Sequence, residues 1–116
     1  MTPRTILQLV HILLFGPLLI AIGMDTDLLP KIPTVAIGTL GIFILGYHAS
    51  RAYGKYQQNL SSWVNIFHAL IVAPPLLAIG YYGVHTPRWL REVVLMLGFT
   101  AMAYHGFYLI RGNDAN

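Results

Sequence analysis

The sequence lacks cysteine entirely and contains few charged residues. None of its 116 residues is cysteine, 9% are Asp, Glu, Lys or Arg, and 56% are hydrophobic. The absence of cysteine excludes disulfide bonds, iron–sulfur clusters and thiolate metal sites. Soluble domains carry about 25% charged residues, so the low charge content excludes an ordinary soluble globular protein. The seven Lys and Arg residues are spread between apolar runs, and they form no patch that could follow a nucleic-acid backbone.

Hydrophobic sequence is abundant instead, and it falls into four long runs. Their approximate limits are residues 5–23, 33–50, 62–83 and 93–110. Each run is close to the ~20 residues that an α-helix needs to cross a bilayer. In lipid every backbone polar group must be bonded within the protein, and runs of this length achieve that as helices. The sequence therefore predicts an all-α fold: a four-helix transmembrane bundle that forms one domain over residues 1–116.

Charged residues at the ends of the predicted helices indicate the orientation. An even number of spans puts both termini and the 51–60 loop on one side of the membrane. That side carries Arg4, Arg51, Lys55 and Arg111 with the acid Asp114, and the other carries Lys31, Arg88 and Arg91 with Asp25, Asp27 and Glu92. The positive-inside rule then assigns both termini to the cytoplasm. We expect a multi-pass integral membrane protein whose partners are the lipid bilayer and either copies of itself or a larger membrane assembly.

The two halves of the sequence resemble each other at a constant offset of 57 positions. The shift superposes His11 on His68, Pro17 on Pro74, Leu40 and Gly41 on Leu97 and Gly98, and Tyr47 and His48 on Tyr104 and His105. Such agreement predicts an internal duplication, with one repeat at about 4–56 and the other at about 61–113. Each repeat holds two spans, so both enter the membrane in the same sense, related by a pseudo-two-fold axis along the membrane normal.

Four of the five histidines lie inside the predicted spans, one in each helix. Counted from the boundary residues Arg4, Ser61, Lys55 and Arg111, they lie six or seven positions into their helices: His11, His68, His48 and His105. At 1.5 Å per residue each imidazole is about 10 Å inside the cytoplasmic boundary. Ionisable residues in membrane helices are costly and indicate function, so we predict a four-histidine cluster near the cytoplasmic face. The plainer alternative is that each histidine only bonds a neighbouring helix.

Three kinds of residue repeat together with the histidines: the amides Gln8 and Asn65, the glycines Gly41 and Gly98, and the tyrosines Tyr47 and Tyr104. Each amide stands three residues before a histidine on the same helix, where it could bond the imidazole and fix its tautomer. Each glycine stands seven residues before a histidine, where it either allows close helix approach or leaves room for a flat ligand. The tyrosines offer a hydrogen bond, ring stacking or simple packing.

Two neutral imidazoles at equal depth on diagonal helices can be the axial ligands of a b-type haem. The diagonal pairs are His11 with His68 and His48 with His105. Adjacent helices, about 8–10 Å apart, leave no room for a porphyrin between them. The propionates or the lipid headgroups would meet the cations of the cytoplasmic side, which are Arg4, Arg51, Lys55 and Arg111. Bound haem would indicate electron transfer.

Three other functions fit the same histidines. Four imidazoles could bind Zn(II), Cu(II) or Ni(II) directly. A histidine ring could gate protons or cations near neutral pH, although the outer half of the spans has few polar residues to continue a path. The protein could also be structural, with histidines and small residues holding helices together in an assembly. No catalytic group for hydrolysis is visible, so any enzymatic chemistry would come from the cofactor.

Two stretches resemble a group of known sequences. Residues 65–74, NIFHALIVAP, and 103–106, AYHG, are similar to small multi-pass membrane proteins of large DNA viruses of algae and protists. The resemblance covers most of the chain. It implies a component of a viral or infected-cell membrane, in the virion or in the host cell, and it carries no activity and no site residue.

Overall fold

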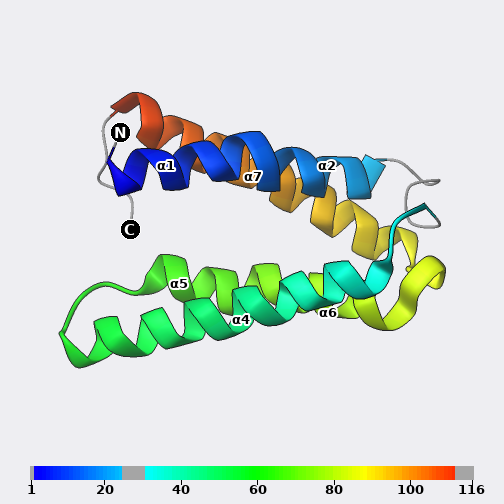
Figure 1. The fold of residues 1–116 in the computed structure, drawn as a ribbon, viewed down its shortest axis with the longest axis horizontal. Helices are drawn as coiled ribbons and strands as arrows, with labels where there is room; N and C mark the ends of the chain where they lie inside the picture. The colour runs from blue at the N-terminus through cyan, green and yellow to red at the C-terminus, as the bar shows by residue number, and fades with distance from the viewer. Residues whose placement is uncertain (1, 25–30, 112–116) are drawn as a thin grey trace. The chain divides into compact units, whose positions relative to one another are not determined.

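The computed structural model of the protein describes residues 2–24 and 31–111. All regular structure within these ranges is helical, which confirms the predicted all-α fold (Figure 1). The elements are α1 (Pro3–Val10), the π-helical turn η1 (His11–Phe15), α2 (Gly16–Met24), α4 (Thr34–Gln57), α5 (Trp63–Phe67), the π-helical turn η2 (His68–Val72), α6 (Ala73–Tyr82), the 3₁₀ turn η3 (Gly83–His85) and α7 (Arg88–Arg111).

Consecutive elements join into four continuous segments, counted over the described residues, that are long and apolar enough to cross a membrane. They are Pro3–Met24, Thr34–Gln57, Trp63–His85 and Arg88–Arg111. The second segment corrects one expectation, because residues 51–57 continue α4 and do not form a loop. Asn59, with a φ of 57°, stops this helix, and the amide of Leu60 bonds the carbonyl of Lys55 in a Schellman-type end.

The described chain divides into two compact units. The first unit combines residues 2–24 with residues 91–111, so that α1, η1 and α2 pack along α7. The second unit contains residues 31–90, in which α4 packs along α5, η2 and α6 (Figure 1). Each unit therefore combines one helix from each predicted repeat. A predicted repeat, in contrast, would pair the two helices that lie within the same 57-residue period.

Glycines bring the helix backbones of each unit into direct contact. In the second unit, a Cβ added at Gly41 would lie 3.0 Å from the backbone nitrogen of Leu77. In the first unit, a Cβ added at Gly98 would lie 2.8 Å from the backbone nitrogen of Ile20. The two contacts are equivalent, because both partners are displaced by 57 positions. Close helix approach is therefore the role of both glycines, and neither leaves space for a flat ligand.

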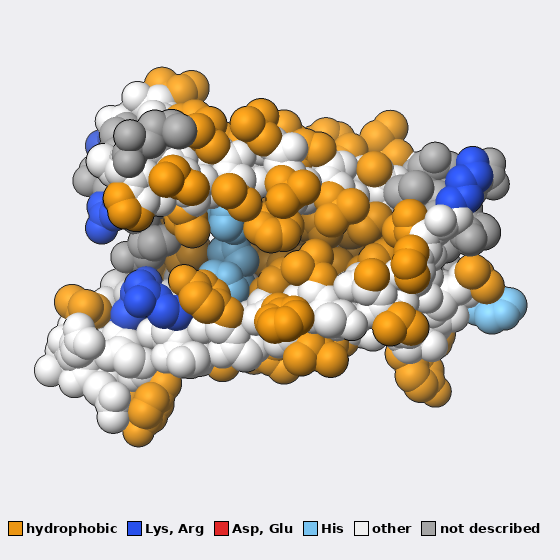
Figure 2. Space-filling view, viewed as in Figure 1, with side chains coloured by type: hydrophobic (Ala, Val, Ile, Leu, Met, Phe, Trp, Pro, Cys, Tyr) orange, Lys and Arg blue, Asp and Glu red, His pale blue; other side chains and the backbone are white. Residues whose placement is uncertain are grey.

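Large apolar side chains remain on the outer faces of the helices. Leu13 is 71% exposed, Phe43 70% and Met96 67%, so that hydrophobic groups cover much of the surface drawn in Figure 2. Other apolar side chains are buried, among them Ile22 and Val94. Exposed apolar side chains of this kind are unfavourable in water and suit a lipid environment.

Replacing Gly98 with alanine should push α2 and α7 apart, because the new methyl group would meet backbone atoms that cannot rotate away. We expect the free energy of unfolding to fall by about 1–3 kcal/mol, measured by thermal unfolding in detergent. Gly106→Ala on the same helix is the matched control, since a Cβ there would meet nothing within 4 Å. Equal stability of the two variants would contradict the packing role.

Candidate functional site

Each unit holds two of the four histidines of the apolar segments, with their rings stacked. In the first unit the rings of His11 and His105 have centroids 4.1 Å apart and planes inclined by 29°. In the second unit the rings of His48 and His68 have centroids 4.2 Å apart and planes inclined by 17°. Each pair joins one histidine from a first-helix position of the repeat to one from a second-helix position. The four predicted histidines are thus two stacked pairs, each described here within its own unit.

The first-helix histidines are bonded to their own helices. The Nδ1–H of His11 donates to the carbonyl oxygen of Leu7 at 2.8 Å, and that of His68 donates to Val64 at 2.7 Å. A neutral imidazole with its proton on Nδ1 carries its lone pair on Nε2. The backbone therefore selects one tautomer, the one in which Nε2 carries the lone pair.

A π-helical turn begins at each of these two histidines. The carbonyl of His11 accepts the amide of Gly16, and the carbonyl of His68 accepts the amide of Ala73, in both cases five residues later. A proline directly follows each of these two amide donors, Gly16 and Ala73. Proline has no N–H and therefore cannot donate a hydrogen bond to the preceding turn. The widened turns therefore accommodate Pro17 and Pro74 within continuous helical segments. Such turns occur frequently at functional sites.

The second-helix histidines are bonded to amide side chains. The Nδ1–H of His105 donates to Oε1 of Gln8 at 2.5 Å, whereas Nδ2 of Asn65 donates to Nδ1 of His48 at 2.9 Å. Gln8 and Asn65 therefore bond a histidine on the facing helix and not the histidine three residues further along their own. The reason is that the Nδ1–H groups of His11 and His68 already donate to backbone carbonyls of their own helices.

The two amides differ in their second contact. Oδ1 of Asn65 accepts a hydrogen bond from Nζ of Lys55 at 2.6 Å, so both polar atoms of this buried amide are bonded. Nε2 of Gln8 is buried and has no hydrogen-bond partner within the described part of the chain. The residue that corresponds to Lys55 at the 57-residue offset is Gly112, which has no side-chain donor.

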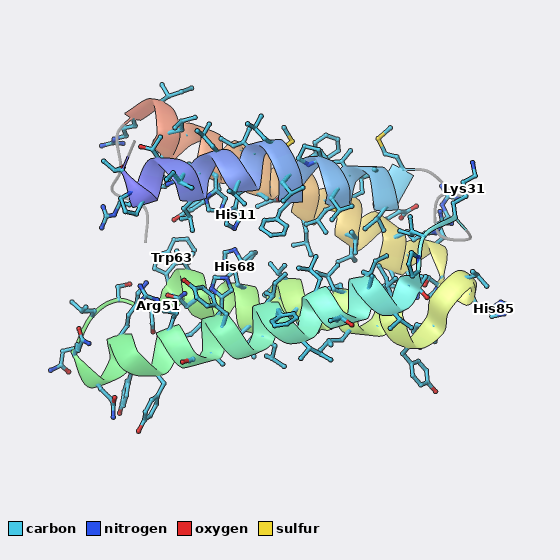
Figure 3. All side chains as sticks on the ribbon, in the orientation of Figure 1. His11, Lys31, Arg51, Trp63, His68 and His85 are labelled. Carbon is cyan, nitrogen blue, oxygen red and sulfur yellow. The ribbon has the colours of Figure 1, made fainter. Side chains whose placement is uncertain are left out.

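The predicted tyrosines and arginines differ in their surroundings. Tyr47 and Tyr104 meet the neighbouring histidine ring edge-on, with centroids 5.0 and 5.1 Å apart. Arg111 lies over the Phe107 ring, whereas Arg4 and Arg51 are exposed. Figure 3 shows Arg51, Trp63 and His68 toward one end of the second unit, and Lys31 and His85 at its other end.

Sequence reasoning assigned Lys55 to headgroups or propionates and missed its bond to Asn65. A signal was available, because Lys55 follows His48 by seven residues and therefore lies on the same face of α4 two turns further on. The bond was not predicted because residues 51–57 were expected to leave the helix.

The chemistry available at these pairs is coordination by imidazole. His11, His68 and His105 can each offer one ring nitrogen to a metal ion. The acceptor on the opposite nitrogen, a carbonyl or a side-chain amide oxygen, is the usual support of a metal-bound histidine. No family model, curated protein or solved structure matches the chain.

Replacing Asn65 with alanine should destabilise the second unit, because His48 and Lys55 both lose the atom that they bond. We expect a loss of about 1–3 kcal/mol in the free energy of unfolding, followed by thermal unfolding in detergent. The control is Thr39→Ala on α4, whose exposed hydroxyl bonds only the carbonyl of Val35 four residues earlier in the same helix, and which should change stability by less than about 0.5 kcal/mol. A loss no larger than that of the control would contradict the importance of the amide.

Proposed function

We propose that this is an integral membrane protein whose histidines coordinate a transition metal, either the iron of a b-type haem or a bare ion such as Zn(II), Cu(II) or Ni(II). One observation carries the proposal. Three imidazoles donate their Nδ1–H to an oxygen, from His11 to Leu7, from His68 to Val64 and from His105 to Gln8. This leaves the lone pair on Nε2 in each, and a neutral imidazole binds a metal through the nitrogen that carries the lone pair while the other N–H is hydrogen-bonded.

The donor set also suits the group chemically. Imidazole nitrogen binds Zn, Cu, Ni and iron, and the sequence supplies neither thiolates nor carboxylates inside the predicted spans. Such nitrogen ligands must be neutral to coordinate, and a membrane interior favours the neutral form. The cost of placing four histidines in apolar helices is then explained by a ligand, whereas packing alone would be served by apolar residues.

The protein residues have distinct tasks in this proposal. His11 and His105 in the first unit, and His68 in the second unit, offer Nε2 as metal ligands. The Leu7 and Val64 carbonyls orient the rings of His11 and His68, and Gln8 orients that of His105. The rings of a stacked pair lie face to face, so they cannot approach one iron atom from opposite sides. Each pair could therefore supply at most one nitrogen ligand to a haem iron. Bound haem would supply one-electron transfer, and a bare ion would supply a Lewis acid or a structural cross-link.

An absorption spectrum of the detergent-purified protein, before and after dithionite, should separate the two forms of the metal when metal analysis is made on the same sample. A Soret band, together with α and β bands that sharpen on reduction, identifies bis-histidine haem. Stoichiometric metal without a chromophore identifies a bare ion. Protein that is colourless and free of metal after expression with ample haem and metals would overturn the proposal, and proton conduction or an assembly role would then be tested.

Single substitutions connect the bound group to the ligands. His68→Ala should reduce the bound haem or metal by at least tenfold, because it removes the Nε2 ligand of the second unit. His85→Ala is the control, since His85 is exposed in η3 at the opposite end of that unit from His68. Equal occupancy in both variants would remove His68 from the ligand set.

The proposed topology places both termini in the cytoplasm, supported by the excess of cations at the Arg51 end of the spans. The natural absence of cysteine allows single-cysteine labelling without a background. A membrane-impermeant maleimide should label His85→Cys in intact cells, and Ser61→Cys only after permeabilisation. The reverse pattern would invert the orientation.

A further inference from the structure

The two stacked pairs are alike in position but differ in the direction of one hydrogen bond. In the first unit an amide oxygen, Oε1 of Gln8, faces the imidazole of His105. In the second unit an amide nitrogen, Nδ2 of Asn65, faces the imidazole of His48. Amide nitrogen only donates and amide oxygen only accepts. The facing nitrogen of the imidazole is therefore a donor in His105 and an acceptor in His48.

Lys55 is the physical cause of this difference. Its ammonium group has three donors and no acceptor, so only the oxygen of Asn65 can face it, as it does at 2.6 Å. Once Oδ1 points to Lys55, the NH₂ group of the same amide must point to the other neighbour, His48. At the equivalent place in the other repeat the sequence has Gly112, which offers no such donor.

We propose that Lys55, acting through Asn65, holds His48 as the tautomer with its proton on Nε2 and thereby excludes His48 from metal coordination. The lone pair on Nδ1 of His48 accepts the hydrogen bond from the Asn65 amide. Nε2 of His48 then carries the ring proton and has no lone pair to offer a metal. His68, stacked on the same ring, keeps its proton on Nδ1 and its lone pair on Nε2. The second unit thus offers one ligand, and Lys55 and Asn65 are positioning residues that select it.

The tautomer part of this inference stands independently of the proposed function, and the part about ligand choice rests on it. Metal-free protein labelled with ¹⁵N-histidine in detergent allows the two parts to be separated. Long-range ¹H–¹⁵N correlation spectra report which ring nitrogen carries the proton. We expect the proton on Nε2 in His48 and on Nδ1 in His11, His68 and His105. A proton on Nδ1 of His48 in the unmodified protein would overturn the proposal.

Two variants test the cause. Asn65→Asp replaces the NH₂ donor with an oxygen of the same shape while keeping an acceptor for Lys55, so His48 should move its proton to Nδ1. Lys55→Arg is the matched control, because it keeps a donor at the same place and should leave the His48 tautomer unchanged. Lys55→Met tests Lys55 itself: without the ammonium, the amide can turn its oxygen to His48, and the His48 proton should again move to Nδ1. An unchanged tautomer in Asn65→Asp would overturn the role of the amide, and an unchanged tautomer in Lys55→Met would overturn the role of Lys55.

Zinc chloride is the probe for ligand choice. On addition of Zn(II) to the unmodified protein, the Nε2 signal of His68 should shift while His48 keeps its proton on Nε2. Coordination by His48 would overturn the exclusion. If neither zinc nor haem changes any histidine signal, the proposed function fails, and the tautomer measurement still decides whether Lys55 controls His48.

Discussion

Two close contacts between helix backbones set the geometry on which the histidine pairs depend. Gly41 in the second unit and Gly98 in the first unit remove the side chain that would otherwise hold the paired helices apart. Each glycine lies seven residues before a histidine, hence two turns away on the same helix face. The approach of the backbones therefore carries the imidazoles of two helices to within about 4 Å of each other.

Polar side chains in an apolar setting impose the second constraint. A buried donor or acceptor costs about 1–3 kcal/mol when it has no partner, so histidines in these helices must find hydrogen bonds nearby. Two kinds of partner meet the Nδ1 atoms: a carbonyl one turn back, and an amide on the facing helix. His11 and His68 use the first, and His48 and His105 use the second. The tautomer of each histidine follows from the partner that Nδ1 has.

Most contacts of the two units correspond across the 57-residue offset. The one that differs is the orientation of the amide beside the second-helix histidine. Stacked rings, carbonyl bonds, π-helical turns and glycine contacts all recur. The amide orientation does not recur, because Lys55 has no counterpart with a side-chain donor. A single cation outside the histidine pairs is thus enough to place the lone pair on Nδ1 in His48 and on Nε2 in His105.

The sequence by itself determined the helical fold, the four apolar segments and the positions of the four histidines along them. Each of these properties depends on counting along one helix, at 1.5 Å and 100° per residue, and needs no knowledge of its neighbours. Tertiary structure decided which histidines pair, that Gln8 bonds His105, and that Asn65 presents its nitrogen to His48. These depend on which helices lie side by side and on the Lys55 donor on the facing helix. Spacing within one helix cannot specify a partner on another, because that partner is set by backbone approach.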